Sequence, residues 1–162
     1  MAHTEYPITP GVRFLREKNI NFIPHLYTYE EHGGTKLSAS ALNVPEHHVV
    51  KTLVMEADNK KPFIVLMHGD YEVSTKQFSR ILNVKRVAPC DAASAQRFTG
   101  YQFGGTSPFG TRTALPVYVE KTIFDLEKIY INGGKRGFLV EITPADLKNA
   151  LQVIEVEVAI PQ

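Results

Sequence analysis

The stretch at residues 100–110, GYQFGGTSPFG, contains four glycines, one proline and two small hydroxyl residues. The pair Gly104 and Gly105 lets the backbone adopt positive φ angles and lets another molecule approach the amide groups, while Pro108 stiffens the exit. Such a loop can offer N–H donors to an anion or to a polarised carbonyl. It can equally be a tight connection between a helix and a strand. The loop alone leaves both interpretations open.

The apolar pattern on both sides of this loop predicts a mixed α/β domain with mostly hairpin-connected strands. Residues 91–99 are expected to form a helix that runs into the loop, and residues 117–119 form a strand after it. Two apolar runs at 52–57 and 62–67 are joined by four polar residues, which predicts a hairpin of buried strands. The other expected elements are helices at 9–19, 38–42, 75–82 and 144–151, a helical turn from Pro45, and strands at 22–29, 128–132 and 138–143.

Size and composition indicate one soluble globular domain spanning residues 1–162, with 43% hydrophobic and 22% charged residues. No apolar run approaches the roughly 20 residues needed to cross a bilayer. The first residues lack the basic and apolar regions of an export signal, so a cytoplasmic protein is expected. The single cysteine, Cys90, cannot form an internal disulfide, which agrees with a reducing compartment.

The charge is nearly balanced, with 18 basic and 17 acidic residues, so the net charge of +1 does not indicate nucleic-acid binding. The distribution is uneven, because residues 76–97 carry five basic residues and one acidic residue. That run can form one basic face on a neutral protein, or it can be an ordinary solvated helix face.

Familiar catalytic motifs are absent: the chain has no GxSxG, HExxH, CxxC, Walker loop or strand–GxGxxG–helix unit. The adjacent pair His47 and His48 points in different directions and makes a poor metal site, so no metal or other cofactor is expected. Cys90 lies at the start of an expected helix, where a thiolate can be stabilised, but no base accompanies it.

Lys51 stands out because it follows two valines and precedes the apolar strand residues 53–55. A lysine in such surroundings costs desolvation energy unless it meets an anion or a carbonyl group. Alternatively, its stem reaches along a strand edge and places the ammonium in water. Tyr27 permits two interpretations in the same way, since it can be a core aromatic or line a site.

Several ordered segments together resemble the bacterial YbaK family of trans-editing aminoacyl-tRNA deacylases, which is related to the editing domain of prolyl-tRNA synthetases. The similarity is collinear over nearly the whole chain. It implies a YbaK-type fold, in which a mostly antiparallel, barrel-like sheet is flanked by helices and a pocket lies between them. The segments are Thr9–Pro10, residues 25–27, 50–53, 99–110, Leu115–Pro116 and 129–137.

The resemblance implies hydrolysis, in trans, of the ester between a wrong amino acid and tRNA, most often cysteine on tRNA for proline. Lys51, Gly104 and Gly105 would be catalytic, and the substrate's own thiol would attack its carbonyl group. Lys51 would either hold a terminal phosphate or polarise the ester. The expected partners are aminoacylated tRNA and possibly prolyl-tRNA synthetase, with no membrane. The residues expected to bind substrate are Tyr27, Thr52, Thr106, Ser107, Pro108, Asn132, Gly133 and Gly134.

The chain departs from this family pattern at three positions. Leu139 stands where cysteine-editing members have an acidic residue, Asn132 stands where serine is frequent, and Thr106 replaces an aliphatic residue. Leu139 leaves the edited amino acid open, and another one such as alanine is an alternative. A module that binds a tRNA end or a nucleotide without cleavage is the second alternative.

Overall fold

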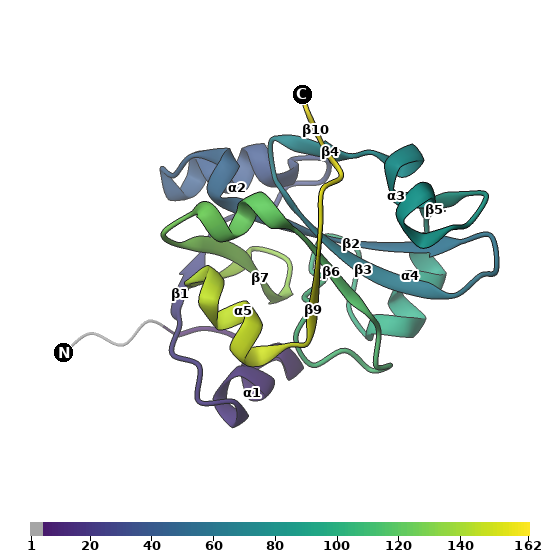
Figure 1. Cartoon of the computed structure of the whole chain (residues 1–162). Coiled ribbons are helices and arrows are strands. Elements are labelled where there is room, and N and C mark those ends of the chain that lie inside the picture. The colour runs from purple at the N-terminus through teal and green to yellow at the C-terminus, as the bar shows by residue number, and fades with distance from the viewer. Residues whose placement is uncertain (1–4) are drawn as a thin grey trace.

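The computed structural model describes residues 5–162 and is organised around an eight-stranded sheet (Figure 1). The strand order is β1-β8-β7-β2-β3-β6-β9, and β5 pairs with the far end of β2. A separate two-stranded sheet joins β4 to β10. The strands are β1 (Ile23–Leu26), β2 (Val49–Ala57), β3 (Pro62–His68), β4 (Tyr71–Val73), β5 (Val87–Pro89), β6 (Val117–Glu120), β7 (Ile129–Lys135), β8 (Phe138–Ile142), β9 (Val153–Val156) and β10 (Ala159–Pro161).

Most pairings of the sheet are antiparallel, as the resemblance implied, but the expectation of mostly hairpin-connected strands is wrong: among the described residues only β2–β3 and β7–β8 pair as consecutive strands. The β2–β3 and β7–β8 hairpins are antiparallel, as are the β1–β8 and β2–β5 pairs. Parallel pairing joins β2 to β7, β3 to β6 and β6 to β9. The parallel pairs are not hairpins, because a parallel neighbour needs a longer crossover connection.

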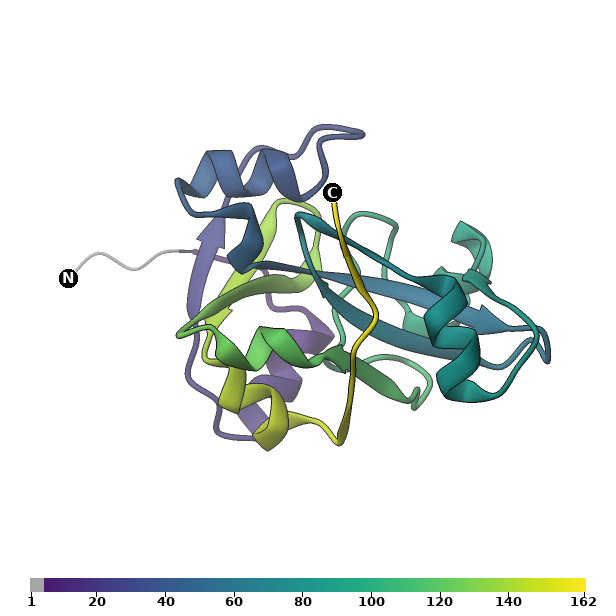
Figure 2. The same ribbon diagram turned by 45° about the horizontal axis from the view of Figure 1, so that its top comes forward.

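Helices cover the sheet in two groups. Figures 1 and 2 show α1, α2 and α5 around β1, β7 and β8, and α3 and α4 beside the distal half of β2 and β3. Four of the five α-helices begin at a side chain that accepts a backbone N–H, namely Thr9, Ser74, Asp91 and Thr143. The helices are α1 (Pro10–Glu17), α2 (Gly34–Leu42), α3 (Thr75–Leu82), α4 (Ala92–Thr99) and α5 (Pro144–Ala150), with 3-10 turns η1 (Glu46–His48) and η2 (Lys121–Asp125).

The start of α2 differs from the prediction. Ser38 was expected to cap a helix, but α2 begins at Gly34, and Ser38 is buried inside it. The Ser38 hydroxyl instead donates to the carbonyl of Thr35, one turn earlier. Gly33 and Gly34 suggested a break in the chain, but Gly34 adopts a positive φ of 62° and opens the helix.

The C-terminal segment forms two short strands that were not predicted, and each pairs with another strand. It runs across the front of the sheet in both views, with β9 beside β6 and β10 beside β4 (Figures 1 and 2). The buried carboxylate of Glu120 accepts hydrogen bonds from the backbone N–H groups of Val158 and Ala159, at 2.8 and 3.0 Å. Charge-assisted bonds of this kind hold the segment against the body of the domain.

The core has three parts, and the smallest positions the candidate site. One large cluster packs α1 and α5 on the sheet, and a second lies beneath α3. The third lies between α2 and the strands β2, β7 and β8, and its buried members are Ala39, Val49, Tyr130 and Leu139. Among residues 5–162, no helix combines the length and apolar character that crossing a membrane requires.

Candidate active site

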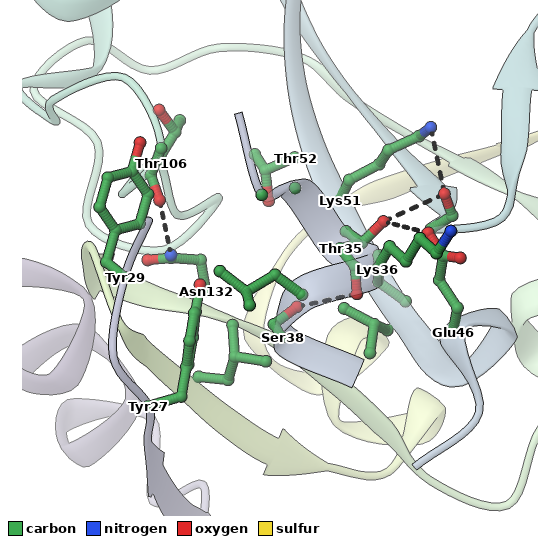
Figure 3. Close-up of a pocket in the computed structure, with 18 of the residues that line it drawn as sticks. Tyr27, Tyr29, Thr35, Lys36, Ser38, Glu46, Lys51, Thr52, Thr106 and Asn132 are labelled. Atoms are coloured by element: carbon green, nitrogen blue, oxygen red, sulfur yellow. Dashed lines mark hydrogen bonds between the residues drawn. The ribbon is translucent and has the colours of Figure 1, made fainter. Parts of the chain in front are cut away.

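A pocket of about 480 Å³ opens between α2, the first residues of β2 and the glycine-rich loop (Figure 3). It therefore brings together segments that are far apart in the sequence. Six of the residues predicted from the sequence line it: Tyr27, Lys51, Thr52, Gly104, Thr106 and Asn132. This cavity is hereafter the main pocket.

Lys51 lies on β2 at one end of the main pocket, where its ammonium is 3.5 Å from the carbonyl oxygen of Gly69. Burial lowers the pKa of the lysine, and the charges of Glu72, Glu46 and Asp70 oppose that shift. A separation of 3.5 Å is at the outer limit for a hydrogen bond. The ammonium is therefore held loosely, by a carbonyl and nearby acids.

The ammonium lies at the other end of the pocket from Asn132, which bonds to Gly104, although Lys51 and the glycine pair were expected to be catalytic together. In Figure 3, the Lys51 ammonium and its dashed bond lie on the side of the pocket that also holds Thr35 and Glu46, opposite Thr106 and Asn132. The charges of Glu72, Glu46 and Asp70 favour the protonated form of the amine in this place. Its four-carbon stem is flexible, so an anion in the pocket can compete with the Gly69 carbonyl for it.

Of the pair Gly104 and Gly105, only Gly104 lines the main pocket. It is exposed, has a φ of 85°, and a Cβ added there would lie 2.7 Å from the Tyr29 hydroxyl. Its carbonyl accepts a hydrogen bond from Asn132 at 3.3 Å. Within residues 5–162 its N–H donates to no other group. This N–H is therefore available to a ligand.

Gly105 is buried and serves the packing of the loop. Its N–H donates to the carbonyl of Gln102 at 2.8 Å, and a Cβ there would lie 2.7 Å from the backbone nitrogen of Arg136. Ser107 and Pro108 are also buried, and the Ser107 hydroxyl accepts from the N–H of Phe109. These three residues do not line the pocket, because they hold the loop against its neighbours.

The second double glycine also lies outside the pocket lining. The carbonyl of Gly133 accepts from the Thr9 hydroxyl, and a Cβ on Gly134 would lie 2.7 Å from the Tyr101 ring. Asn132 connects the two glycine turns, since its amide donates to Gly104 while its oxygen accepts from Gly134 and Lys135. Substrate-binding roles for Gly133 and Gly134 remain predictions, and their contacts are with protein.

One wall of the pocket is apolar. Leu139 is 4% exposed and packs with Tyr130, Ala39 and Val49. Burial raises the pKa of the adjacent Tyr27, so its phenol is protonated at neutral pH. Leu139 stands at the position where cysteine-editing members of the YbaK family, which the sequence resembles, have an acidic residue. This wall therefore suits an uncharged group and offers no partner for a cation.

The hydroxyl oxygen of Thr52 is buried and has no hydrogen-bond partner in the described chain. A buried hydroxyl without a partner costs about 1–3 kcal/mol. Thr52 lines the main pocket, and rotation about its Cα–Cβ bond would turn the buried oxygen toward a ligand that supplies the missing partner.

Replacing Thr52 with valine, which has nearly the same shape, is expected to leave the free energy of unfolding unchanged or raise it by about 1 kcal/mol. The same change should weaken substrate use by about 5- to 30-fold, since one hydrogen bond is lost. Urea unfolding and steady-state kinetics measure the two effects. A marked loss of stability would mean that the hydroxyl has a partner within the protein.

Sequence reasoning missed several lining residues, chiefly at the start of α2. The Thr35 hydroxyl donates to the Glu46 carboxylate at 2.8 Å and also lies 3.1 Å from the Gly69 carbonyl. Phe103 forms part of the rim and is 70% exposed. The GGT sequence before α2 resembles a simple break, so no local signal marked Thr35.

One cluster could offer metal ligands, and it lies near the Lys51 end of the pocket. His47, His68 and Asp70 have ligand atoms within 4.8 Å of one another. The two imidazole rings stack at 3.8 Å, and both ring nitrogens of His68 hydrogen bond, one to the His47 carbonyl and one to Thr122. Burial lowers the pKa of His68. These bonds use the positions that a metal would need.

Cys90 is a poor nucleophile in its surroundings. Burial, with smaller contributions from Glu56 and Asp91, raises the pKa of its thiol to about 11. It is not among the residues that line the main pocket. The favourable thiolate position considered from the sequence is therefore not realised.

The basic run forms a second hollow, of about 530 Å³, between α3 and β5. Four of its five basic residues line this hollow, while Arg97 lies on α4. None of the four makes an ion pair within residues 5–162. This basic groove is lined by Lys76, Arg80, Lys85 and Arg86.

Comparison with known proteins gives a consistent set of matches. The model of the aminoacyl-tRNA editing domain family matches residues 31–150. The chain is 24% identical over 137 residues to EbsC of Enterococcus faecalis, whose name assigns it Cys-tRNA(Pro)/Cys-tRNA(Cys) deacylase activity; the match covers 84% of each chain. It is 28% identical over 103 residues to the proline–tRNA ligase of Lactobacillus helveticus, but that match spans only 18% of the ligase.

Solved structures share the fold. A hypothetical protein, APE2540, superposes with a TM-score of 0.85 at 20% identity, over 93% of this chain and 99% of that one. A second crystal structure, described as a trans-editing enzyme for prolyl-tRNA synthetase, superposes with a TM-score of 0.81 at 19% identity, over 95% of this chain and 99% of that one.

Proposed function

Because the chain belongs to the aminoacyl-tRNA editing domain family, we propose that it hydrolyses mischarged aminoacyl-tRNA in trans, with Cys-tRNA(Pro) as its leading substrate. Hydrolytic editing is the activity of the family. The observation that carries the proposal for this chain is a pocket that combines the free Gly104 N–H, the Lys51 ammonium and an apolar wall.

Such a pocket suits ester hydrolysis without a protein nucleophile. An aminoacyl ester is already activated, so a site mainly needs to orient the carbonyl and stabilise the developing oxyanion. The lining residues include no cysteine, and the Thr35 and Ser38 hydroxyls bond to Glu46 and to backbone carbonyls rather than to a histidine. Gly104 would donate its N–H to the carbonyl oxygen, and Lys51 would hold the terminal phosphate or polarise the ester.

The substrate would supply the nucleophile. The cysteine sulfur attacks its own carbonyl carbon, the ester C–O bond breaks, and the terminal ribose hydroxyl leaves with the proton from the thiol. The product is a cyclic thioester, which water then opens to free cysteine. The apolar wall at Leu139 and Tyr27 would hold the short side chain in the bent conformation that this attack requires.

The identity of the amino acid that is removed from the tRNA is the more specific part of the proposal. The deacylase activity in the name of EbsC supports cysteine, whereas Leu139 in place of a carboxylate keeps alanine as the alternative. Alanine lacks a thiol, so its removal would need an attacking water molecule. Whether cleavage requires a thiol on the substrate therefore distinguishes the reaction on cysteinyl-tRNA from the reaction on alanyl-tRNA.

The test is a panel of tRNA for proline charged with cysteine, alanine or proline and incubated with the pure protein. Loss of the cysteinyl ester with retention of the prolyl ester is expected. Loss of the alanyl ester alone would move the assignment to alanine. Retention of all three esters, in the presence and absence of prolyl-tRNA synthetase, would contradict hydrolytic editing.

A second candidate function is binding of a tRNA end without cleavage, and the basic groove favours it. The groove adjoins β5, which pairs with β2 at Glu56, five residues beyond Lys51. At about 3.3 Å per residue the separation along β2 is roughly 17 Å. That equals the rise of about five nucleotides of a helical strand. This separation supports a role of the groove in contacting phosphates near the acceptor end.

Replacing Lys76, Arg80, Lys85 and Arg86 together with alanine should weaken tRNA binding by about 10-fold or more at low salt. The slope of log K against log salt should become shallower by about 3 to 4 if all four residues contact phosphates, since each phosphate contact contributes roughly 0.7–0.9. Filter binding at several salt concentrations measures both effects. A variant with Arg13, Arg16, Lys121 and Lys148 changed instead is the charge-matched control, and equal effects in both variants would count against the groove.

The remaining parts of the proposal concern context. We propose that residues 1–162 act as one editing domain, that the protein works in the cytoplasm where tRNA is charged, and that prolyl-tRNA synthetase contributes tRNA selectivity. The matches to proline–tRNA ligases support the last point. A stimulation of cleavage by added synthetase would support it directly.

A further inference from the structure

Phe103 is the most exposed large apolar residue of the described chain, with 70% of its surface accessible. It precedes Gly104 and lies on the rim of the main pocket. Leaving an aromatic ring in water forfeits the free energy that its burial would bring. An exposed ring at the mouth of a pocket is therefore a candidate contact for a bound molecule.

The backbone beneath Phe103 is held in place. The guanidinium of Arg136 donates from Nε to the Phe103 carbonyl at 2.7 Å, and its Cζ lies 4.9 Å from the centre of the Tyr29 ring. The next residue, Gly104, packs closely beneath the Tyr29 hydroxyl. The ring thus projects from a fixed support rather than from a free loop.

We infer that Phe103 is a stacking platform for the terminal base of the tRNA, an inference that rests on the proposed function. In an aminoacyl-tRNA the acyl ester and the base are attached to the same ribose. If the ester carbonyl reaches the Gly104 N–H, the base lies within a few bonds of that point, at the rim where Phe103 projects. Aromatic side chains bind unpaired bases by stacking, with little dependence on the identity of the base.

A protein surface is the competing occupant of this ring. The position of the ring favours the base, because Phe103 directly precedes Gly104, the residue proposed to donate its N–H to the ester carbonyl. Charge agrees, since Arg136 beneath the ring suits the phosphates that accompany a base, with Glu30 as an opposing charge in the pocket lining.

The experiment compares Phe103→Ala, Phe103→Leu and Phe103→Trp on two substrates, Cys-tRNA(Pro) and cysteine methyl ester, which has no base. The alanine and leucine variants should raise KM for the tRNA about 5- to 100-fold, the range that loss of one stacked base gives. Tryptophan should preserve it. Cleavage of the methyl ester should stay unchanged in all three, because that substrate has nothing to stack.

A spectroscopic readout tests the platform independently of cleavage. A tRNA whose terminal adenine is replaced by 2-aminopurine should lose fluorescence on binding to the wild-type protein and to Phe103→Trp, but not to Phe103→Ala. Ile154→Ala, which removes an apolar side chain that is 48% exposed on β9 and outside the pocket, is the matched control.

Equal quenching by wild type and Phe103→Ala would overturn the inference even if the ester is cleaved. Unchanged tRNA kinetics together with lost binding to prolyl-tRNA synthetase would assign the ring to a protein partner and would overturn it as well. Failure of the wild-type protein to cleave any ester would count against the proposed function alone, because the quenching experiment does not depend on turnover.

Discussion

Replacing Lys51 with alanine is expected to lower kcat/KM for the preferred aminoacyl-tRNA by about 100-fold or more, the loss typical of a removed electrostatic contact in a transition state. The change removes one of the two lysines that line the pocket, the one beside the Gly69 carbonyl and near Glu46, Asp70 and Glu72. Rapid-quench measurement of the remaining ester gives the rate. Undiminished cleavage would exclude any role of the ammonium.

The split between kcat and KM separates the two roles considered for Lys51. A lysine that holds a phosphate should mainly affect KM, whereas one that polarises the ester should mainly affect kcat. Lys51→Met keeps the length of the side chain without its charge, so it controls for lost packing. Circular dichroism and urea unfolding should show that both variants remain folded, because the side chain is only half-buried.

The dependence on pH gives a second readout of the same residue. Burial lowers the pKa of Lys51 below that of an ordinary lysine. The ammonium is present below that pKa, so the part of the activity that needs it should decline as the pH rises through it. In Lys51→Arg, which stays charged to much higher pH, the alkaline decline should move upward. The spontaneous hydrolysis of the ester is subtracted at each pH.

Replacing Gly104 with alanine is expected to reduce kcat/KM by about 100-fold, because a Cβ at this position would push the Tyr29 hydroxyl and the loop apart. The residue also has a φ of 85°, which costs an alanine about 1–2 kcal/mol. Steady-state kinetics and urea unfolding measure the two effects separately. Retention of full activity would mean that the site does not need a backbone free of a side chain at this position.

Gly100→Ala is the matched control for backbone strain. Gly100 has a φ of 80°, yet a Cβ there would meet only the Arg112 side chain, at an ordinary contact distance of 3.5 Å. It does not line the main pocket. A similar loss of stability with nearly unchanged kinetics is expected, so a comparable loss of activity in both variants would point to general loosening of the loop.

Elements with local signals were predictable from the sequence. The helix after Thr9 and Pro10 begins as expected because its cap and its first turn are set by adjacent residues. The helix predicted at residues 75–82 from its apolar face has the same bounds as α3, Thr75–Leu82. Strands β4, β5, β9 and β10 were missed, since they are short and their pairing partners are distant in sequence.

The candidate site was predictable in outline. A lysine within an apolar strand and a glycine-rich loop both pointed to the cavity that Lys51 and Gly104 line. The sequence could not tell which glycine of the pair faces a ligand, because Gly105 satisfies the same pattern by packing on Arg136. It also could not reveal that the ammonium contacts the Gly69 carbonyl, with Glu72, Glu46 and Asp70 near enough to affect its pKa.

The protonated state of Cys90 has a practical consequence for studying this molecule. A thiol with a pKa of about 11 has on the order of one part in ten thousand as thiolate at neutral pH, so maleimide dyes modify it slowly. It is the sole cysteine of the chain. A second cysteine engineered on an exposed surface can therefore carry a single fluorophore, with the native residue left in place.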